Sequence, residues 1–137
     1  MKRVLFDTNV ILDLVLNRPN FVEPAKRLFI AIDEKRLLGF MSATTVTDIY
    51  YITTRERNRV FAALSLRRLV RVLEIIAVDT NIILSALNSP IKDFEDAVQV
   101  EAAKSLGLDF IVTRNQRDFH LSPVSAVPPE KLLDMLK

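Results

Sequence analysis

The fold follows from one stretch near the start of the chain, Val4-Leu5-Phe6-Asp7-Thr8-Asn9-Val10-Ile11-Leu12-Asp13-Leu14. Its first three residues are a short apolar run typical of a buried strand. After Asn9 the apolar residues change to helical spacing, with Val10, Ile11, Leu14 and Val15 on one side. Asp7 therefore stands where a strand passes into a helix. In parallel α/β sheets this is the carboxyl edge, where ligand sites gather.

Asp7 has two interpretations at this position. It can cap the helix that follows, as a lone Asp before a helix often does, or it can carry chemistry. A second stretch, Asp79-Thr80-Asn81-Ile82-Ile83-Leu84, nearly copies the residues from Asp7 to Leu12 and serves as an internal control. If Asp7 is only a cap, Asp79 should be its equal; if Asp7 is chemical, mutation should separate the two.

Length and composition limit the number of domains and the kinds of site that the chain can form. The chain has 137 residues, half of them hydrophobic, which predicts a single domain spanning residues 1–137 with a proper core. A net charge of +2 and a pI near 9.1 permit a polyanionic partner without requiring one. The absence of cysteine excludes disulfides, thiolate nucleophiles and Cys-bound metals, and the single histidine, His120, excludes sites built from several imidazoles.

Membrane segments are not expected. Asp7 and Asp13 interrupt the first apolar run, no cleavage site of small residues follows it, and no apolar stretch approaches the roughly 20 residues needed to span a bilayer. The expected location is the cytoplasm.

Strand and helix patterns alternate along the chain. They predict a three-layer α/β/α fold with a central, mainly parallel sheet of four or five strands and right-handed crossovers. The predicted strands are 4–6, 37–42, 74–78, 109–113 and 124–127. The predicted helices are 10 to about 17, 24–35, 42–54, 80–87, 93–106 and 128–136. The buried face of helix 93–106 is predicted to comprise Phe94, Ala97, Val98, Ala102 and Leu106.

Acidic residues recur where this fold brings chain segments together. Asp7 and Asp118 should lie just past strand ends, and the helices bearing Asp48 and Asp96 can open toward the same edge of the sheet. Asp93 also fits the N-cap of its helix, and Glu95 and Asp96 fit the first turn, where the helix dipole favours negative charge. If the carboxylates do converge, their repulsion is relieved by protonation or by a hard cation. Oxygen ligands without His or Cys favour Mg²⁺ or Mn²⁺.

The most basic segment runs from Arg55 to Leu73. Its arginines alternate with apolar residues, so it can be a surface that faces phosphates. It can equally be the solvated side of an amphipathic helix whose long side chains cover the core.

Four motifs together resemble the PIN domain, a metal-dependent ribonuclease fold found in toxins of prokaryotic toxin–antitoxin pairs. They span nearly the whole chain: Phe6-Asp7-Thr8-Asn9-Val10-Ile11-Leu12, Thr47-Asp48-Ile49-Tyr50-Tyr51, Asp93-Phe94-Glu95-Asp96-Ala97 and Ile111-Val112-Thr113-Arg114-Asn115-Gln116-Arg117-Asp118-Phe119. No single motif is specific. Their order, in matching strand and helix contexts, makes chance agreement improbable.

The resemblance implies a role for each matching residue. The catalytic acids would be Asp7, Asp48, Asp96 and Asp118, and the metal ligands Asp7, Asp96, Asp118 and Asp93. Asp48 replaces the usual glutamate, and Asn115 replaces an aspartate found in many relatives, which bears on a second metal. Thr8, Asn9, Thr113 and Asn115 would hydrogen-bond the metal ligands, and Arg55, Arg114 and Arg117 would contact RNA.

The implied activity is Mg²⁺- or Mn²⁺-dependent endonucleolytic cleavage of single-stranded RNA that leaves a 5′-phosphate. The resemblance also implies an antitoxin that covers the acidic cleft, and self-association into a homodimer or larger oligomer. His120 is interpreted as a surface or turn residue.

Two other functional classes are considered. A PIN fold that binds RNA or protein without cleavage is compatible with Asp48 and Asn115, although the nearly complete acid set argues against it. A haloacid-dehalogenase-like phosphatase with Asp7 as nucleophile would need a second aspartate two residues on, where the chain has Asn9.

Overall fold

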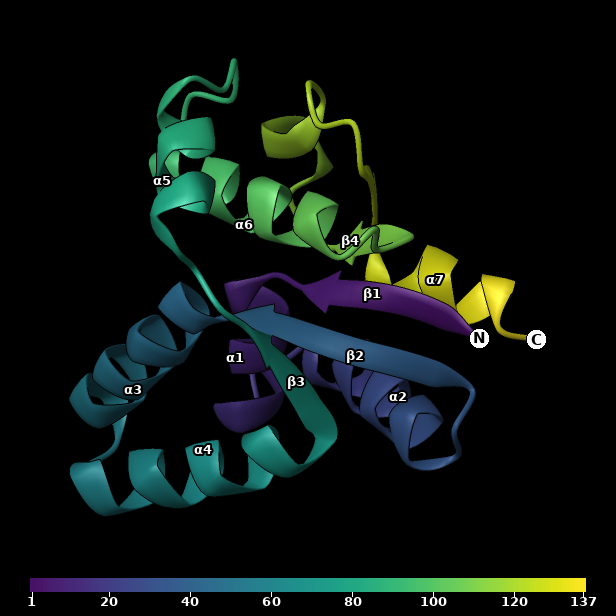
Figure 1. Ribbon diagram of the computed structural model, residues 1–137. Helices are drawn as coiled ribbons and strands as arrows, with labels where there is room; N and C mark the ends of the chain where they lie inside the picture. Colours follow the sequence, from purple (N-terminus) through teal and green to yellow (C-terminus); the bar gives the residue numbers. More distant parts are fainter.

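A parallel five-stranded sheet forms the centre of the computed structural model, which describes residues 1–137 (Figure 1). The strands are β1 (Lys2–Phe6), β2 (Leu37–Ser42), β3 (Leu73–Ile76), β4 (Phe110–Val112) and β5 (Ser125–Val127). Their order is β3-β2-β1-β4-β5, and all neighbouring pairs are parallel. The predicted three-layer α/β/α architecture is confirmed.

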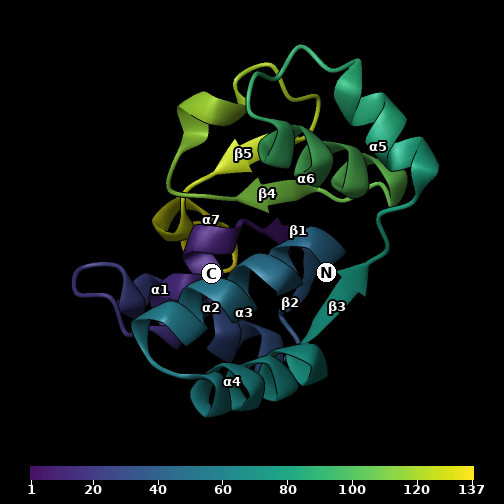
Figure 2. The same ribbon diagram turned by 90° about the vertical axis from the view of Figure 1, so that its left-hand side faces the viewer.

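Helices cover both faces of this sheet, as the two views show (Figures 1 and 2). The elements on one face are α1 (Thr8–Val15), α2 (Val22–Asp33), α3 (Ala43–Glu56), α4 (Arg59–Val72) and α7 (Pro129–Met135). The elements on the other are α5 (Thr80–Leu87), α6 (Phe94–Ser105) and the short 3-10 helix η1 (Gln116–Phe119). The side chains of β1 alternate between the two cores: Val4 and Phe6 enter the first and Leu5 the second.

The sequence periodicity located the helices well, with boundary shifts that have local causes. Helix α2 starts at Val22 rather than Pro24, because a proline in the first helical turn sacrifices no hydrogen bond. Strand β3 ends at Ile76 instead of continuing to Val78. The predicted buried face of α6 was wrong at both ends: Phe94 is 45% exposed and Leu106 is 41% exposed. Gln99, one of the polar residues of α6, is 97% buried instead.

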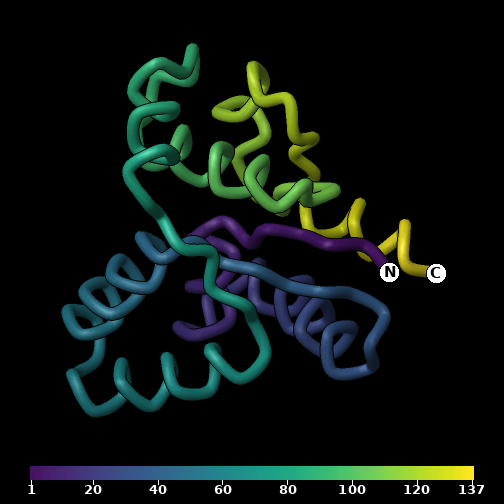
Figure 3. The backbone as a smooth tube through the Cα atoms, in the orientation of Figure 1, coloured from purple at the N-terminus to yellow at the C-terminus, as the bar shows by residue number.

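The sheet order has a reversal point between β1 and β4. From β1 the chain runs outward through β2 and β3, then crosses back to β4 and continues to β5 on the other side. Crossover connections diverge at such a point and leave a crevice at the carboxyl ends of the strands. Both chain termini lie at the opposite end of the sheet (Figure 3). Asp7 directly follows β1 and Thr113 directly follows β4, so both residues border the crevice. No helix of the structure is both long and apolar enough to cross a bilayer.

Candidate functional site at the reversal point of the sheet

Asp7 is held by two side chains from distant parts of the sequence. It occupies the N-cap position of α1 but makes no side-chain cap hydrogen bond. Instead, Gln99 Nε2 donates to its Oδ1 at 3.0 Å and Thr113 Oγ1 donates to its Oδ2 at 2.7 Å. By contrast, Asp79 Oδ1 accepts the Ile82 N–H at 3.0 Å and caps α5. Two nearly identical stretches therefore place their aspartates in different roles.

Further carboxylates reach the same crevice from α3, α6 and η1. Asp48 lies in the second turn of α3, Glu95 and Asp96 lie in the first turn of α6, and Asp118 lies in η1. Burial raises the pKa of Asp96 to about 7, and repulsion from Asp93, Asp7, Asp118 and Glu95 contributes to that rise. The expected convergence of acids from four elements is thus present in the folded chain.

Glu95 belongs to this acidic group as well. A hydrogen bond with the Asp48 side chain raises the pKa of Glu95, followed by desolvation and by repulsion from Asp48, Asp93 and Asp7. Two carboxyl groups can be hydrogen-bonded to each other only when one is protonated. Asp48 and Glu95 therefore face one another across the space between α3 and α6.

No positive side chain neutralises the acids of the crevice. Every ion pair of the structure lies elsewhere, and none includes Asp7, Asp48, Glu95, Asp96 or Asp118. The donor set, oxygen only and rich in carboxylate, suits Mg²⁺ or Mn²⁺. As the side chains stand, no group of three acids is arranged to hold one ion. Mg²⁺ is commonly bound through one or two carboxylates and several waters, so the residues present still fit such an ion.

Asp93 is the one candidate metal ligand whose carboxylate caps a helix. Its Oδ1 accepts the Asp96 N–H at 3.0 Å and caps α6. This contact confirms the capping interpretation of Asp93 and leaves its second oxygen without a hydrogen bond.

The four residues expected to hydrogen-bond the metal ligands make different contacts in the structure. Thr113 is fully buried and donates to Asp7, and the Asn115 N–H in turn donates to Thr113 Oγ1 at 3.0 Å. Thr8 instead shares a hydrogen bond with Thr45, and Asn9 accepts one from Arg18. Of the four, only Thr113 therefore hydrogen-bonds an acid of the crevice.

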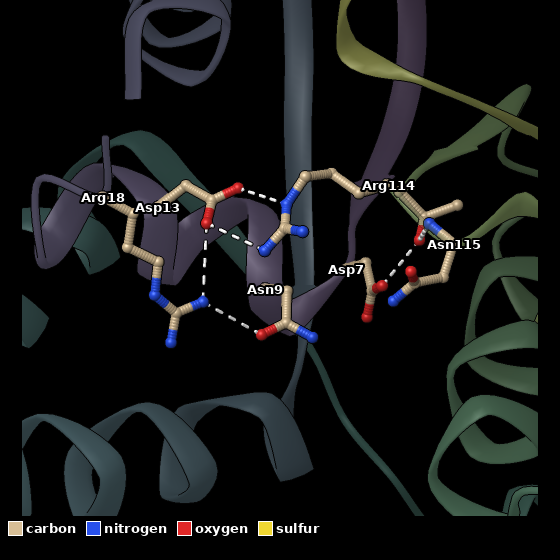
Figure 4. A network of polar contacts seen from close by, with 7 residues as sticks. Asp7, Asn9, Asp13, Arg18, Arg114 and Asn115 are labelled. Atoms are coloured by element: carbon tan, nitrogen blue, oxygen red, sulfur yellow. Dashed lines mark hydrogen bonds and ion pairs between the residues drawn. The ribbon is translucent and has the colours of Figure 1, made fainter. Parts of the chain in front are cut away.

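The three arginines proposed to contact RNA are also placed differently. Arg114 binds the buried Asp13 through Nε at 2.7 Å and Nη2 at 3.1 Å (Figure 4). Its guanidinium also stacks on Phe21, 3.9 Å from the ring centre. Arg117 is exposed on η1, next to Asp118. Arg55 is exposed in the last turn of α3.

Sequence reasoning missed two members of the site, Gln99 and Glu95. Gln99 follows Asp96 by three residues and interrupts the apolar run Ala97-Val98-Gln99-Val100 on α6, a polar intrusion into a buried face that could have signalled a buried contact. Its Oε1 is buried without a hydrogen-bond partner. Glu95 was attributed to the helix dipole, and only the tertiary structure reveals its neighbour Asp48 on α3.

Comparisons with known proteins bear on the family and the fold of the chain. The family model described as "PIN domain" matches residues 3–117 of the chain. A search of curated protein sequences found no significant match.

Solved structures with the same fold include three relevant examples. A toxin–antitoxin complex from Klebsiella pneumoniae superposes with a TM-score of 0.70 at 22% identity and covers 92% of this chain and 97% of the other. VapBC2 from Rickettsia felis, bound to a promoter DNA fragment, gives a TM-score of 0.72 at 15% identity, covering 92% and 98%. VapC20 from Mycobacterium tuberculosis, described as a Sarcin-Ricin loop cleaving toxin, gives 0.66 at 17% identity, covering 79% and 86%. At such identities the likeness establishes the fold.

Proposed function

Since the chain belongs to the PIN domain family, we propose that it is a nuclease that hydrolyses single-stranded RNA with Mg²⁺ or Mn²⁺ and acts as the toxin of a toxin–antitoxin pair. The observation that carries this proposal is the convergence of un-neutralised acids from β1, α3, α6 and η1 at the reversal point of the sheet. Such a group of like charges is costly to fold and is relieved by a divalent cation.

Asp7, Asp96 and Asp118 are the residues that would hold the cation, with the free oxygen of Asp93 beside them. When bound, Mg²⁺ or Mn²⁺ supplies a Lewis acid that holds the scissile phosphate, lowers the pKa of a water and stabilises the leaving oxygen. Gln99 and Thr113 fix the Asp7 carboxylate, because each occupies one of its oxygens and leaves a further lone pair on both. Asp48 would orient the attacking water.

An antitoxin is the proposed protein partner. The similar structures from Klebsiella pneumoniae and Rickettsia felis were solved as toxin–antitoxin complexes. A cationic side chain from such a partner would neutralise the acids of the crevice in the absence of metal.

The proposal is tested by incubating metal-free protein with a mixed single-stranded RNA pool and then adding Mg²⁺, Mn²⁺ or a chelator. We expect metal-dependent cutting by wild type and by Asp79→Asn, whose aspartate only caps α5, and loss of cutting by Asp7→Asn. Equal activity of Asp7→Asn and wild type would overturn the assignment.

A protein that binds RNA without cutting it is the alternative, favoured by Asp48 and Asn115. In that case, folded wild type would cut nothing with any metal. Mn²⁺ titration of wild type and Asp96→Asn would then show no difference in affinity.

A further inference from the structure

A cavity of about 410 Å³ opens beside the acidic crevice, between the segment that precedes α6 and the segment around η1. Its walls are Pro90, Ile91, Lys92, Asp93, Asp96, Arg117, Asp118, His120 and Leu121. Three of these residues, Asp93, Asp96 and Asp118, are proposed metal ligands. Any group in the cavity therefore lies next to the proposed reaction centre. The volume is within the usual range for small-ligand sites.

Positive charge lines the cavity without being neutralised. Lys92 and Arg117 form no ion pair, although Asp93, Asp96 and Asp118 share the same cavity. The contrast with Asp13 is informative, because that carboxylate is held by both Arg18 and Arg114 (Figure 4). The buried Asp13 carboxylate is paired with two arginines, whereas Lys92 and Arg117 are unpaired and therefore free to bind an anion.

His120 lines the cavity with one of its ring nitrogens already bonded. Its Nδ1 is 2.9 Å from the Arg117 carbonyl oxygen, and since a carbonyl can only accept, Nδ1 carries the hydrogen. In the neutral ring Nε2 is therefore an acceptor, which suits a ribose hydroxyl and not a phosphate oxygen. The hydrogen bond also fixes the ring against η1, the element that carries Arg117 and Asp118.

The remaining walls are apolar. Ile91 is 93% buried, whereas Leu121 is 50% exposed, and both contribute apolar surface to the cavity. A ligand that combines a phosphate with a planar, weakly polar ring system matches this division of the walls. A nucleotide has that composition.

The basic surface of α3 and α4 is poorly placed to bind a nucleotide next to the scissile bond. Arg59 and Arg67 line a separate cavity with Tyr50, Val60 and Leu64, and no acid of the crevice borders it. Arg55 follows Asp48 by seven residues on α3, about 10 Å along the helix axis. A nucleotide adjacent to the scissile bond would reach the cavity beside η1 first.

We propose that this cavity is a nucleotide subsite, in which Lys92 and Arg117 bind the phosphate of the RNA residue next to the scissile bond while His120, Ile91 and Leu121 contact its base or ribose. This inference rests on the proposed nuclease function and specifies which side of the site the RNA occupies.

The test is titration of a nucleoside 5′-monophosphate into the full chain with Mg²⁺ present, followed by amide chemical shifts in NMR spectra. We expect shifts at residues 91–96 and 117–121. Binding should be about tenfold weaker in the double variant Lys92→Ala/Arg117→Ala, which removes two charge-assisted contacts. The matched control Arg59→Ala/Arg67→Ala also removes two cationic side chains and should bind like wild type.

Shifts confined to α3 and α4, or weaker binding in the control variant alone, would overturn the subsite. Equal binding of the nucleoside without phosphate would do so as well. Cleavage is a separate readout: the Lys92→Ala/Arg117→Ala variant should show a raised KM with little change in kcat. If wild type cuts RNA but its cavity gives no shifts, the subsite fails and the nuclease proposal stands. If nothing is cut and the cavity still binds the nucleotide, the nuclease proposal fails.

Discussion

Asp7 and Asp79 show how neighbours, and not local sequence, set the role of a side chain. Each follows a strand and precedes Thr-Asn and an apolar helix, yet only Asp79 turns back to cap its helix. Asp7 is drawn away by donors located 92 and 106 residues further along the chain. Its carboxylate is thereby 94% buried and fixed at the crevice.

Gln99→Leu is expected to weaken Mn²⁺ binding by about tenfold, because partners that orient a ligand typically contribute that much to metal affinity. The free energy of unfolding should change little, because the substitution also removes the buried Oε1 that has no partner. Calorimetric Mn²⁺ titration with parallel urea unfolding measures both quantities. Gln116→Leu on the exposed η1 is the control, and unchanged Mn²⁺ affinity in Gln99→Leu would contradict the positioning role.

Asp96→Asn is expected to stabilise the metal-free protein at neutral pH and above. The pKa of Asp96 is about 7 in the folded chain against an ordinary 3.8, so between these values the folded state binds more protons than the unfolded state. Wild type therefore loses stability as pH rises from about 4 to 7, and the variant does not. At this half-buried site the gain should be about 1–2 kcal/mol at pH 8.

Urea unfolding in chelator at pH 5 and pH 8 measures that gain, with the exposed Asp134→Asn as control. A variant less stable than wild type at pH 8 would show that Asp96 has a neutralising partner in the folded protein.

At the scale of elements, the ends of α5 and α6 depend on single residues. Asp79 caps the start of α5, Asp93 caps the start of α6, and Gly107 follows the last turn of α6 with a φ of +62°. The left-handed conformation is open to glycine without steric cost and strains any residue that has a Cβ. These features were legible in the sequence because caps act over three or four residues.

Gly107→Ala is expected to lower the free energy of unfolding by about 1 kcal/mol through backbone strain alone. Nothing lies within 4 Å of the position an added Cβ would take, so a steric clash makes no contribution. Thermal or urea unfolding checks this value. The control is Gly107→Asn, which tolerates the left-handed region better and should lose less. Equal losses for the two substitutions would argue against conformational strain.

At the scale of the whole molecule, Arg114 joins the end of β4 to α1 across 101 residues of sequence. Its bidentate contact with Asp13, which is 99% buried, is supported by Arg18 and Asn9 (Figure 4). The ring of Phe21 packs against the Arg114 guanidinium. This network borders Asp7 and fixes the two chain segments that flank the crevice. Arg114 therefore contributes to the shape of the site whether or not it contacts RNA.

Arg114→Met is expected to lower the free energy of unfolding by about 3 kcal/mol, since removing one partner leaves a buried charge incompletely paired. Because Asp13 keeps its contact with Arg18 at 3.4 Å, the loss of unfolding free energy should lie at the lower end of the range for broken buried ion pairs. The double variant Asp13→Leu/Arg114→Met should recover much of it, because neither charge then remains buried. Urea unfolding of the two variants and wild type decides: a double variant no more stable than Arg114→Met would contradict this account.

The sequence by itself determined the alternation of strands and helices, the caps at Asp79 and Asp93, the stop at Gly107 and the family resemblance. These depend on periodicity and on contacts over a few residues, which a linear pattern records. Only the tertiary structure decided that Asp7 is held by Gln99 and Thr113, that Glu95 faces Asp48, and that Arg114 is bound to Asp13. Each of these contacts joins segments at least 47 residues apart, brought together by the order of the strands. Their partners were therefore invisible to any local pattern.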